Sequence, residues 1–192
     1  MSAFLGPIHY WLYNKIGNQE ELTREIADYA ADENLIDDAE KYTKRLPRLE
    51  TVIDEGNIHG WLQNCISDAE KRYADLVGEI ISNDCEKLKE LEKVAFEFGK
   101  KHSICCDDAA EIYKSFEDFF VNGMPCDRIN TVTESFSDKV SWEMTQDIHF
   151  NYWDKDSEPY YVLRKKVMDG MLAESDFKVE MFDKAHYMII KK

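Results

Sequence analysis

The chain lacks long apolar stretches and has few basic residues. No stretch approaches the roughly 18 consecutive apolar residues of a membrane-spanning helix, and residues 1–7 lack the positive flank and apolar core of a signal peptide. Lys and Arg number 24 against 39 Asp and Glu, which gives a formal charge of −15 and a pI near 4.7. Such a surface repels phosphate backbones and anionic lipid, so we expect a cytoplasmic protein without nucleic-acid or membrane partners.

The sequence also lacks the cysteine pattern of a disulfide framework and the motifs of the common enzyme classes. The five cysteines are odd in number and include the adjacent Cys105 and Cys106, so we expect thiols rather than a disulfide framework. The sequence has no glycine-rich phosphate loop, dinucleotide fingerprint, Gly-x-Ser-x-Gly or His-Glu-x-x-His, which leaves nucleotide-dependent enzymes, serine hydrolases and zincins without support. Glu-x-x-His is absent too, which argues against a ferritin-like di-iron bundle.

Apolar residues recur at helical spacing over most of the 192 residues, which suffice for one well-buried core. We therefore predict a single domain over residues 1–192 of mainly α class: an irregular bundle of six to eight helices with a short C-terminal β element. The predicted helices cover 7–16, 19–34, 37–45, 49–83, 84–99, 108–121, 125–153 and 160–172. One or two short strands are expected within 177–190, where β-favouring residues gather.

Two of these helices have specific start signals. Gly56 and Gly60 each weaken the helix over 49–83 by roughly 1 kcal/mol relative to alanine, so we expect that helix to begin only at Asn57. Asp107 or Asp108 is expected to cap the helix predicted over 108–121. The helical faces place these aromatic side chains inward: Trp11, Trp61, Phe116, Phe119, Phe120, Trp142 and Trp153.

An eleven-residue phrase occurs twice, at 6–16 and 56–66, and is the most informative feature of the chain. Seven of its positions agree, where unrelated segments would share about one. The match places His9 and His59 in equivalent settings, on two helices that we predict to be pseudo-equivalent. If those helices pack against each other, the two imidazoles come together beside the apolar stripe.

The shared histidines support two interpretations. Imidazole is the commonest metal ligand and a general acid-base near neutral pH, so His9 and His59 are candidate ligands of a transition metal, and the adjoining Trp11 and Trp61 are candidates for contacting a cofactor. In the alternative, each histidine hydrogen-bonds the backbone or a neighbouring asparagine and only satisfies a polar corner of the core.

His149 and Cys126 are the candidate catalytic residues. His149 follows an isoleucine, as His9 and His59 do, and precedes Trp153 on what reads as a third helix. Cys126 follows a proline at an expected helix start, where unsatisfied N–H groups stabilise a thiolate. The alternative for Cys126 is an ordinary small core residue. Glu70 lies on the same helix as His59, and we expect it to be one of many solvated acids.

In the segments 4–11, 57–63 and 123–127, the chain resembles an uncharacterised family of small, mainly helical proteins of anaerobic clostridia and archaea. The resemblance extends over most of the chain. It implies no activity, but it implies that His9, His59 and Cys126 belong to one site, and an anaerobic source fits five thiols.

Two functional hypotheses follow from these observations. The first is a cytoplasmic helical pocket protein that acts as a metal- or cofactor-dependent enzyme of anaerobic metabolism, with histidine and cysteine at a buried site and a small molecule or a metal as partner. The second is a non-catalytic protein that forms a homodimer or binds a small ligand, in which the histidines and tryptophans are structural.

Overall fold

The structure is a computed structural model that describes residues 5–192. Residues 1–4 lie outside the described residues. They include the beginning of the segment assessed for a signal peptide and Phe4 of the segment 4–11. The helices are α1 (Pro7–Asp32), α2 (Ile58–Asn83), α3 (Leu88–Lys101), α4 (Ala109–Phe119) and α5 (Glu158–Met171). The strands are β1 (Asn130–Ser135), β2 (Lys139–Met144), β3 (Phe177–Met181) and β4 (His186–Lys191).

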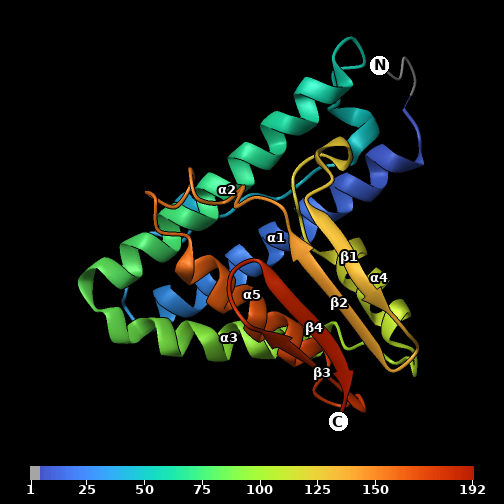
Figure 1. The fold of residues 1–192 in the computed structure, drawn as a ribbon. Coiled ribbons are helices and arrows are strands. Elements are labelled where there is room, and N and C mark those ends of the chain that lie inside the picture. Colours follow the sequence, from blue (N-terminus) through green and yellow to red (C-terminus); the bar gives the residue numbers. More distant parts are fainter. Residues whose placement is uncertain (1–4) are drawn as a thin grey trace.

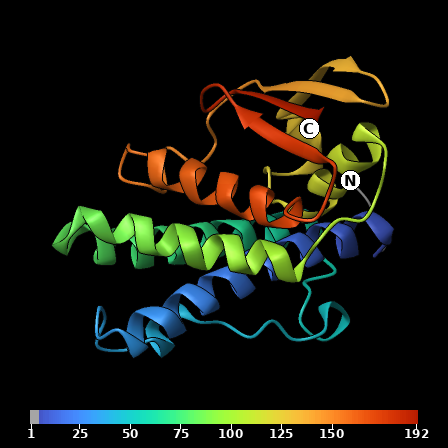
Figure 2. The same ribbon diagram turned by 90° about the horizontal axis from the view of Figure 1, so that it is seen from below.

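The elements form three layers (Figure 1, Figure 2). The four strands make an antiparallel sheet in the order β1-β2-β4-β3, which covers one side of the helices. Helices α4 and α5 contact this sheet, and α1, α2 and α3 lie on their far side. Within the described chain, no helix has the length and apolarity needed to cross a membrane.

Helix α1 is continuous where the sequence predicted two helices. Gly17 and Asn18, the expected stop, lie in its interior. The Asn18 amide donates to the Phe119 carbonyl at 3.1 Å, and α1 buries apolar side chains on both sides of Gly17. This packing outweighs the roughly 1 kcal/mol that a glycine costs inside a helix.

The two predicted helix starts are confirmed. Asn57 precedes α2, and its side chain accepts a hydrogen bond from the Gly60 N–H at 3.1 Å. Asp108 precedes α4 and accepts from the N–H groups of Ala110 and Glu111 at 2.8 and 3.1 Å. Local capping chemistry therefore fixes where these helices begin.

The predicted helix over 125–153 is wrong. A three-residue 3-10 turn at Pro125–Asp127 is followed by the antiparallel pair β1 and β2. Alternate residues of β2 are buried, namely Val140, Trp142 and Met144, and this period of two marks a strand with one covered face. The mainly α class is confirmed, but the described chain has five α-helices rather than six to eight, and the β part has four strands rather than one or two.

The buried apolar side chains form two clusters. The larger cluster joins α3, α5 and the sheet to the C-terminal halves of α1 and α2, and it contains Trp142 and Trp153. The smaller cluster joins the first turns of α1 and α2 to Val121 and Met124. Trp11 and Trp61, predicted to lie in the core, are only partly buried at the edge of the smaller cluster.

The backbones of α3 and α5 touch at Gly99 and Gly170. A Cβ atom built on Gly99 would lie 2.1 Å from the Val167 carbonyl oxygen, and one on Gly170 would lie 2.1 Å from the Phe96 carbonyl oxygen. These distances are far shorter than any van der Waals contact, and both obstacles are backbone atoms inside helices. The two helices can approach this closely only because neither residue has a side chain.

We therefore expect Gly99→Ala and Gly170→Ala each to lower the free energy of unfolding by an amount at or above the top of the usual overpacking range of about 1–3 kcal/mol. Gly78→Ala on α2 is the matched control, because a Cβ there meets nothing within 4 Å. It should stabilise the protein by about 0.5–1 kcal/mol. Denaturant unfolding of the three variants measures these changes. Equal stability of the Gly99→Ala and Gly78→Ala proteins would contradict the contact.

Candidate functional site

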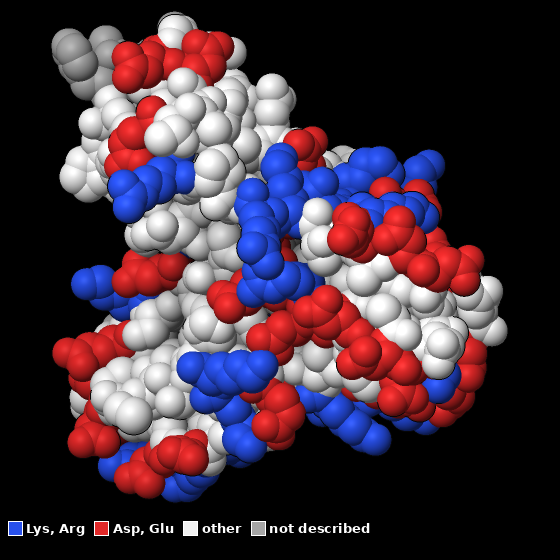
Figure 3. Space-filling view, turned by 180° about the vertical axis from the view of Figure 1, so that it is seen from behind, with Lys and Arg blue, Asp and Glu red and all other residues white. Residues whose placement is uncertain are grey.

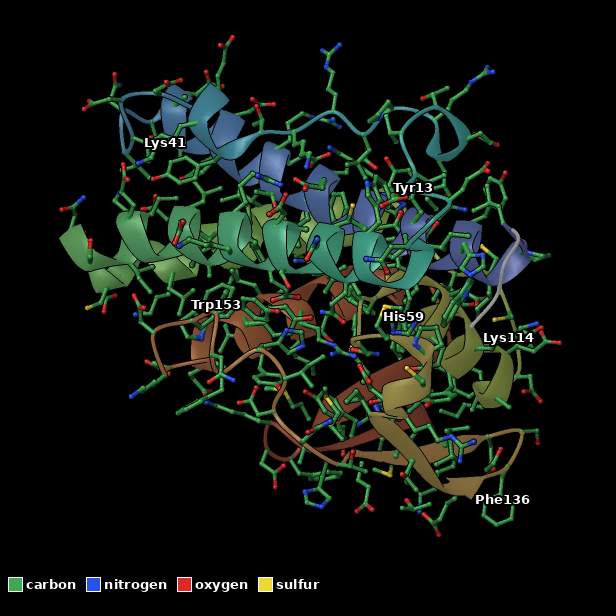
Figure 4. The ribbon with its side chains drawn as sticks, turned by 90° about the horizontal axis from the view of Figure 1, so that it is seen from above. Tyr13, Lys41, His59, Lys114, Phe136 and Trp153 are labelled. Atoms are coloured by element: carbon green, nitrogen blue, oxygen red, sulfur yellow. The ribbon has the colours of Figure 1, made fainter. Side chains whose placement is uncertain are left out.

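The starts of α1 and α2 lie side by side and, with the segment after α4, form a cavity of about 210 Å³ that is partly open to solvent. Figure 4 shows His59 at the end of α2 that faces this segment. We call this cavity the N-terminal pocket, and the residues that line it are Ile8, His9, Leu12, His59, Leu62, Met124, Pro125 and Cys126. The structure therefore brings together three of the predicted site residues, from segments up to 117 positions apart in the sequence.

His9 has a structural role at the start of α1. The Gly6 N–H donates to His9 Nδ1 at 2.9 Å. Because a backbone N–H can only donate, Nδ1 must be unprotonated, and the neutral ring carries its hydrogen on Nε2. The imidazole thus satisfies one of the N–H groups that the first turn of a helix leaves without a partner. His59 is the second residue of α2, where Asn57 provides the cap instead.

Charge around this pocket differs from that of the rest of the chain. Neither α1 nor α2 has Asp or Glu in its first turn, although acidic residues outnumber basic ones 39 to 24. The positive ends of both helix dipoles are therefore not neutralised by their own first turns. Figure 3 shows acidic and basic side chains interleaved over most of one face, with larger uncharged areas on the lobe that holds these helix starts.

The donor atoms do not form a metal centre. In the described part of the chain, no three His, Cys, Asp or Glu side chains are grouped so that they could hold one ion. His9 also uses its Nδ1 lone pair in the helix cap, so its remaining ring nitrogen carries a hydrogen and is not ready to coordinate. The expectation of a transition metal at His9 and His59 thus finds no donor set here.

Cys126 lies in the 3-10 turn rather than at a helix start. The turn has three residues, and the Cys126 thiol is exposed, with Sγ 3.8 Å from Asp127 Oδ1. A single turn has no dipole comparable to that of α1. The reason given above for a stabilised thiolate at Cys126 is therefore absent. What remains is its place in the wall of the N-terminal pocket.

Trp11 and Trp61 do not line the N-terminal pocket. Trp11 donates from Nε1 to Asp118 on α4 at 2.8 Å, and the Lys15 ammonium lies 4.0 Å from the centre of its ring. The Trp61 ring packs at 5.8 Å from that of Tyr13, across the interface of α1 and α2. Both tryptophans thus join helices, and neither is brought into the N-terminal pocket with the predicted site residues.

His149 lies far from the other two histidines. It is fully buried in the irregular segment between β2 and α5, with Nδ1 3.1 Å from Glu70 Oε2 and its ring stacked at 3.6 Å on Tyr160. Glu70 follows His59 by eleven residues on α2, which is about 16 Å of helical rise. His149 therefore does not join His9 and His59, and the prediction that Glu70 is solvated is wrong, because Glu70 is 2% exposed.

The contact between Glu70 and His149 determines which ring nitrogen of His149 carries the hydrogen. A carboxylate only accepts hydrogen bonds, so the Glu70 carboxylate places the His149 hydrogen on Nδ1. The other atoms of this pair, Glu70 Oε1 and His149 Nε2, are buried without a partner among residues 5–192. The pair is thus sealed in the core, away from solvent.

Arg164 on α5 is a further buried polar residue, and the sequence analysis missed it. It is 4% exposed and shares a helical face with Tyr160 and Val167, which are also buried. A charged residue on an apolar stripe was the signal that the sequence offered, because arginine is almost never fully buried without a reason.

Comparison with known proteins identifies no relative: no family model matches the chain, and no curated protein or solved structure is significantly similar to it. The resemblance to proteins of anaerobes stays a prediction. The geometry of the N-terminal pocket and of the pair of Glu70 and His149 is therefore the basis for interpreting them.

The structure predicts an order of thiol reactivity. Burial raises the pKa of the Cys65 thiol and, with nearby Glu111, that of Cys106, whereas Cys85, Cys105 and Cys126 are exposed. With iodoacetamide at pH 7, mass spectrometry should find the three exposed cysteines alkylated before the other two, because the thiolate is the reactive form.

The shared pocket adds a test of coupling to this order. We expect His59→Gln to slow the alkylation of Cys126 without changing that of Cys85, and His186→Gln, on the exposed part of β4, to change neither. If His59→Gln affected Cys126 no more than His186→Gln does, thiol and imidazole would be chemically independent.

The pair of Glu70 and His149 should be costly to break. Glu70→Ala leaves a buried neutral imidazole without its acceptor, and we expect a loss of about 1–3 kcal/mol in the free energy of unfolding. The double variant Glu70→Met/His149→Phe should recover part of this loss, because it leaves no polar group behind. Asp75→Ala, on the exposed side of α2, should change stability by less than about 0.5 kcal/mol. If the effects of Glu70→Met and His149→Phe, measured singly by denaturant unfolding, added up strictly to that of the double variant, the pairing would be contradicted.

Proposed function

We propose that this protein binds a small organic molecule in the N-terminal pocket, and that the site works without a metal. The observation that carries the proposal is that His9, His59 and Cys126 line one cavity of about 210 Å³. Apolar cavities of about 150 Å³ hold benzene, so this volume suits a ligand with a single ring.

The lining suggests the chemistry of the ligand. Ile8, Leu12, Leu62 and Met124 provide apolar walls, and no acidic side chain lines the pocket. The Nε2–H of His9 is a donor whose position is fixed by the helix cap. A ligand with an apolar ring and one acceptor, such as a carbonyl oxygen, complements these groups, since apolar walls with a few placed polar groups are typical of small-molecule sites.

This proposal develops the small-ligand form of the second hypothesis. A metal-dependent enzyme would need a donor set that the described side chains do not form. A homodimer through Trp11 or Trp61 has less support, because both rings are partly buried and already make contacts within the monomer, Trp11 with Asp118 and Trp61 with Tyr13. A cytoplasmic location remains part of the proposal, on the arguments from charge and thiols given above.

The test compares benzamide with toluene by protein-observed NMR. We expect benzamide to shift resonances around His59 and Cys126 and to bind at least about tenfold more tightly than toluene, because its carbonyl can accept a hydrogen bond; tenfold corresponds to about 1.4 kcal/mol. Benzamide should also protect Cys126 from iodoacetamide.

A blocking variant and a matched control locate the binding. Ile8→Trp fills the pocket from its rim, where Ile8 is 48% exposed, and should weaken benzamide binding at least about tenfold. Val132→Trp adds the same side chain at an exposed position on β1 and should leave binding unchanged. Shifts that map elsewhere, or that survive Ile8→Trp, would show that the pocket is not the site.

A further inference from the structure

A second, smaller cavity of about 20 Å³ lies among the helices, away from the N-terminal pocket. Its apolar wall includes Phe98 on α3 and Phe120 after α4, and its polar wall consists chiefly of Gln19, Tyr73 and Arg164. These three come from α1, α2 and α5, so the cavity lies where the main helices meet. A space of this size holds about one water-sized particle.

Arg164 brings a positive charge to this cavity and has no opposite charge beside it. Its Nη1 donates to Asn122 Oδ1 at 2.8 Å, and the guanidinium carbon lies 4.9 Å from the centre of the Phe120 ring. Within residues 5–192, Arg164 forms no ion pair with a carboxylate, and the Glu117 carboxylate acts on it only at longer range. A buried charge is costly unless it is paired, and a neutral amide and a ring face leave the charge in place.

Three donors at the cavity have no partner. Arg164 Nε, Tyr73 OH and Gln19 Nε2 are each buried and bond to nothing among the residues that the structure describes. Each of these atoms carries a hydrogen that it can donate. Leaving a buried donor unsatisfied is unfavourable, so three of them around one space indicate that an acceptor fills it.

The nearby acidic side chains are engaged elsewhere. Glu117 Oε1 accepts from the amides of Asn122 and Asn130, and Glu70 pairs with His149. Burial, against the opposing charge of Glu117, lowers the pKa of Lys15 to about 8, with Arg164 also lowering it and Asp118 raising it. Arg164 thus has the Glu117 carboxylate in its surroundings but, among the described residues, no ion pair with it.

We propose that this smaller cavity binds a single small monovalent anion, of the size of chloride, held by Arg164, Tyr73 and Gln19. The volume excludes phosphate esters and larger organic acids, which need several times the space of one water. The alternative occupant is a water molecule, which would satisfy the donors but leave the charge of Arg164 unpaired. The two are distinguished by experiment.

Thermal unfolding of the full chain in sodium chloride and in sodium gluconate, at equal ionic strength, is the test. We expect the Tm to rise and saturate with chloride and not with gluconate, because an anion that binds only the folded state stabilises it by mass action. Arg164→Met should abolish the chloride effect, and Tyr73→Phe and Gln19→Leu should each weaken it. Arg24→Met, at a half-buried arginine that pairs with Glu21 and does not line this cavity, should leave it unchanged.

Crystals of the unchanged protein grown in bromide give a readout that does not depend on the variants folding. We expect an anomalous peak within hydrogen-bond distance of Arg164 Nε. Equal Tm in the two salts, a chloride effect that persists in Arg164→Met, or a bromide peak only at the surface would overturn the proposal and assign the cavity to water. Benzamide binding should be independent of chloride, so failure of either proposal leaves the other testable.

Discussion

The contact between the backbones of α3 and α5 at Gly99 and Gly170 is the constraint on which the interior depends. It fixes the position of α5 along its axis and so places Arg164, six residues before Gly170, where α1, α2 and α5 meet. Phe98, next to Gly99, forms the opposite wall of the same cavity. A larger separation of the two helices would admit water around Arg164 and remove the reason for its unpaired donors. The glycines and the buried charge are therefore parts of one arrangement.

The histidines of the repeated phrase have different roles in the structure. Leu12 and Leu62 occupy equivalent repeat positions, and both are buried between α1 and α2. The repeat thus serves largely to pack two helices that start side by side. His9 closes the first turn of α1, whereas His59, with Asn57 as the cap, remains in the pocket wall. Equivalent positions in sequence therefore have different hydrogen-bonding roles.

Capping residues and apolar spacing correctly predicted the starts of helices. They failed where the structure depends on contacts between segments that are distant in the sequence. Asn57 and Asp108 mark their helices by side-chain chemistry that acts within three residues. The β1–β2 hairpin was missed because Ile129, Val132 and Phe136 also fit helical spacing, and Phe136 in fact projects from the hairpin tip (Figure 4). The meeting of His9 and His59 followed from the repeat. Glu70 and His149 are 79 positions apart, and no local pattern pairs them.

The central claim is that the histidines suggested as one site divide into a helix cap, a buried pair and a pocket wall. Long-range ¹H–¹⁵N NMR of the imidazole nitrogens tests this division directly, because it reports which nitrogen carries the hydrogen. The account predicts opposite neutral tautomers: His9 with its hydrogen on Nε2 and His149 with its hydrogen on Nδ1, neither changing when zinc is added. A hydrogen on Nδ1 of His9, or a zinc-induced shift shared by His9 and His59, would contradict it.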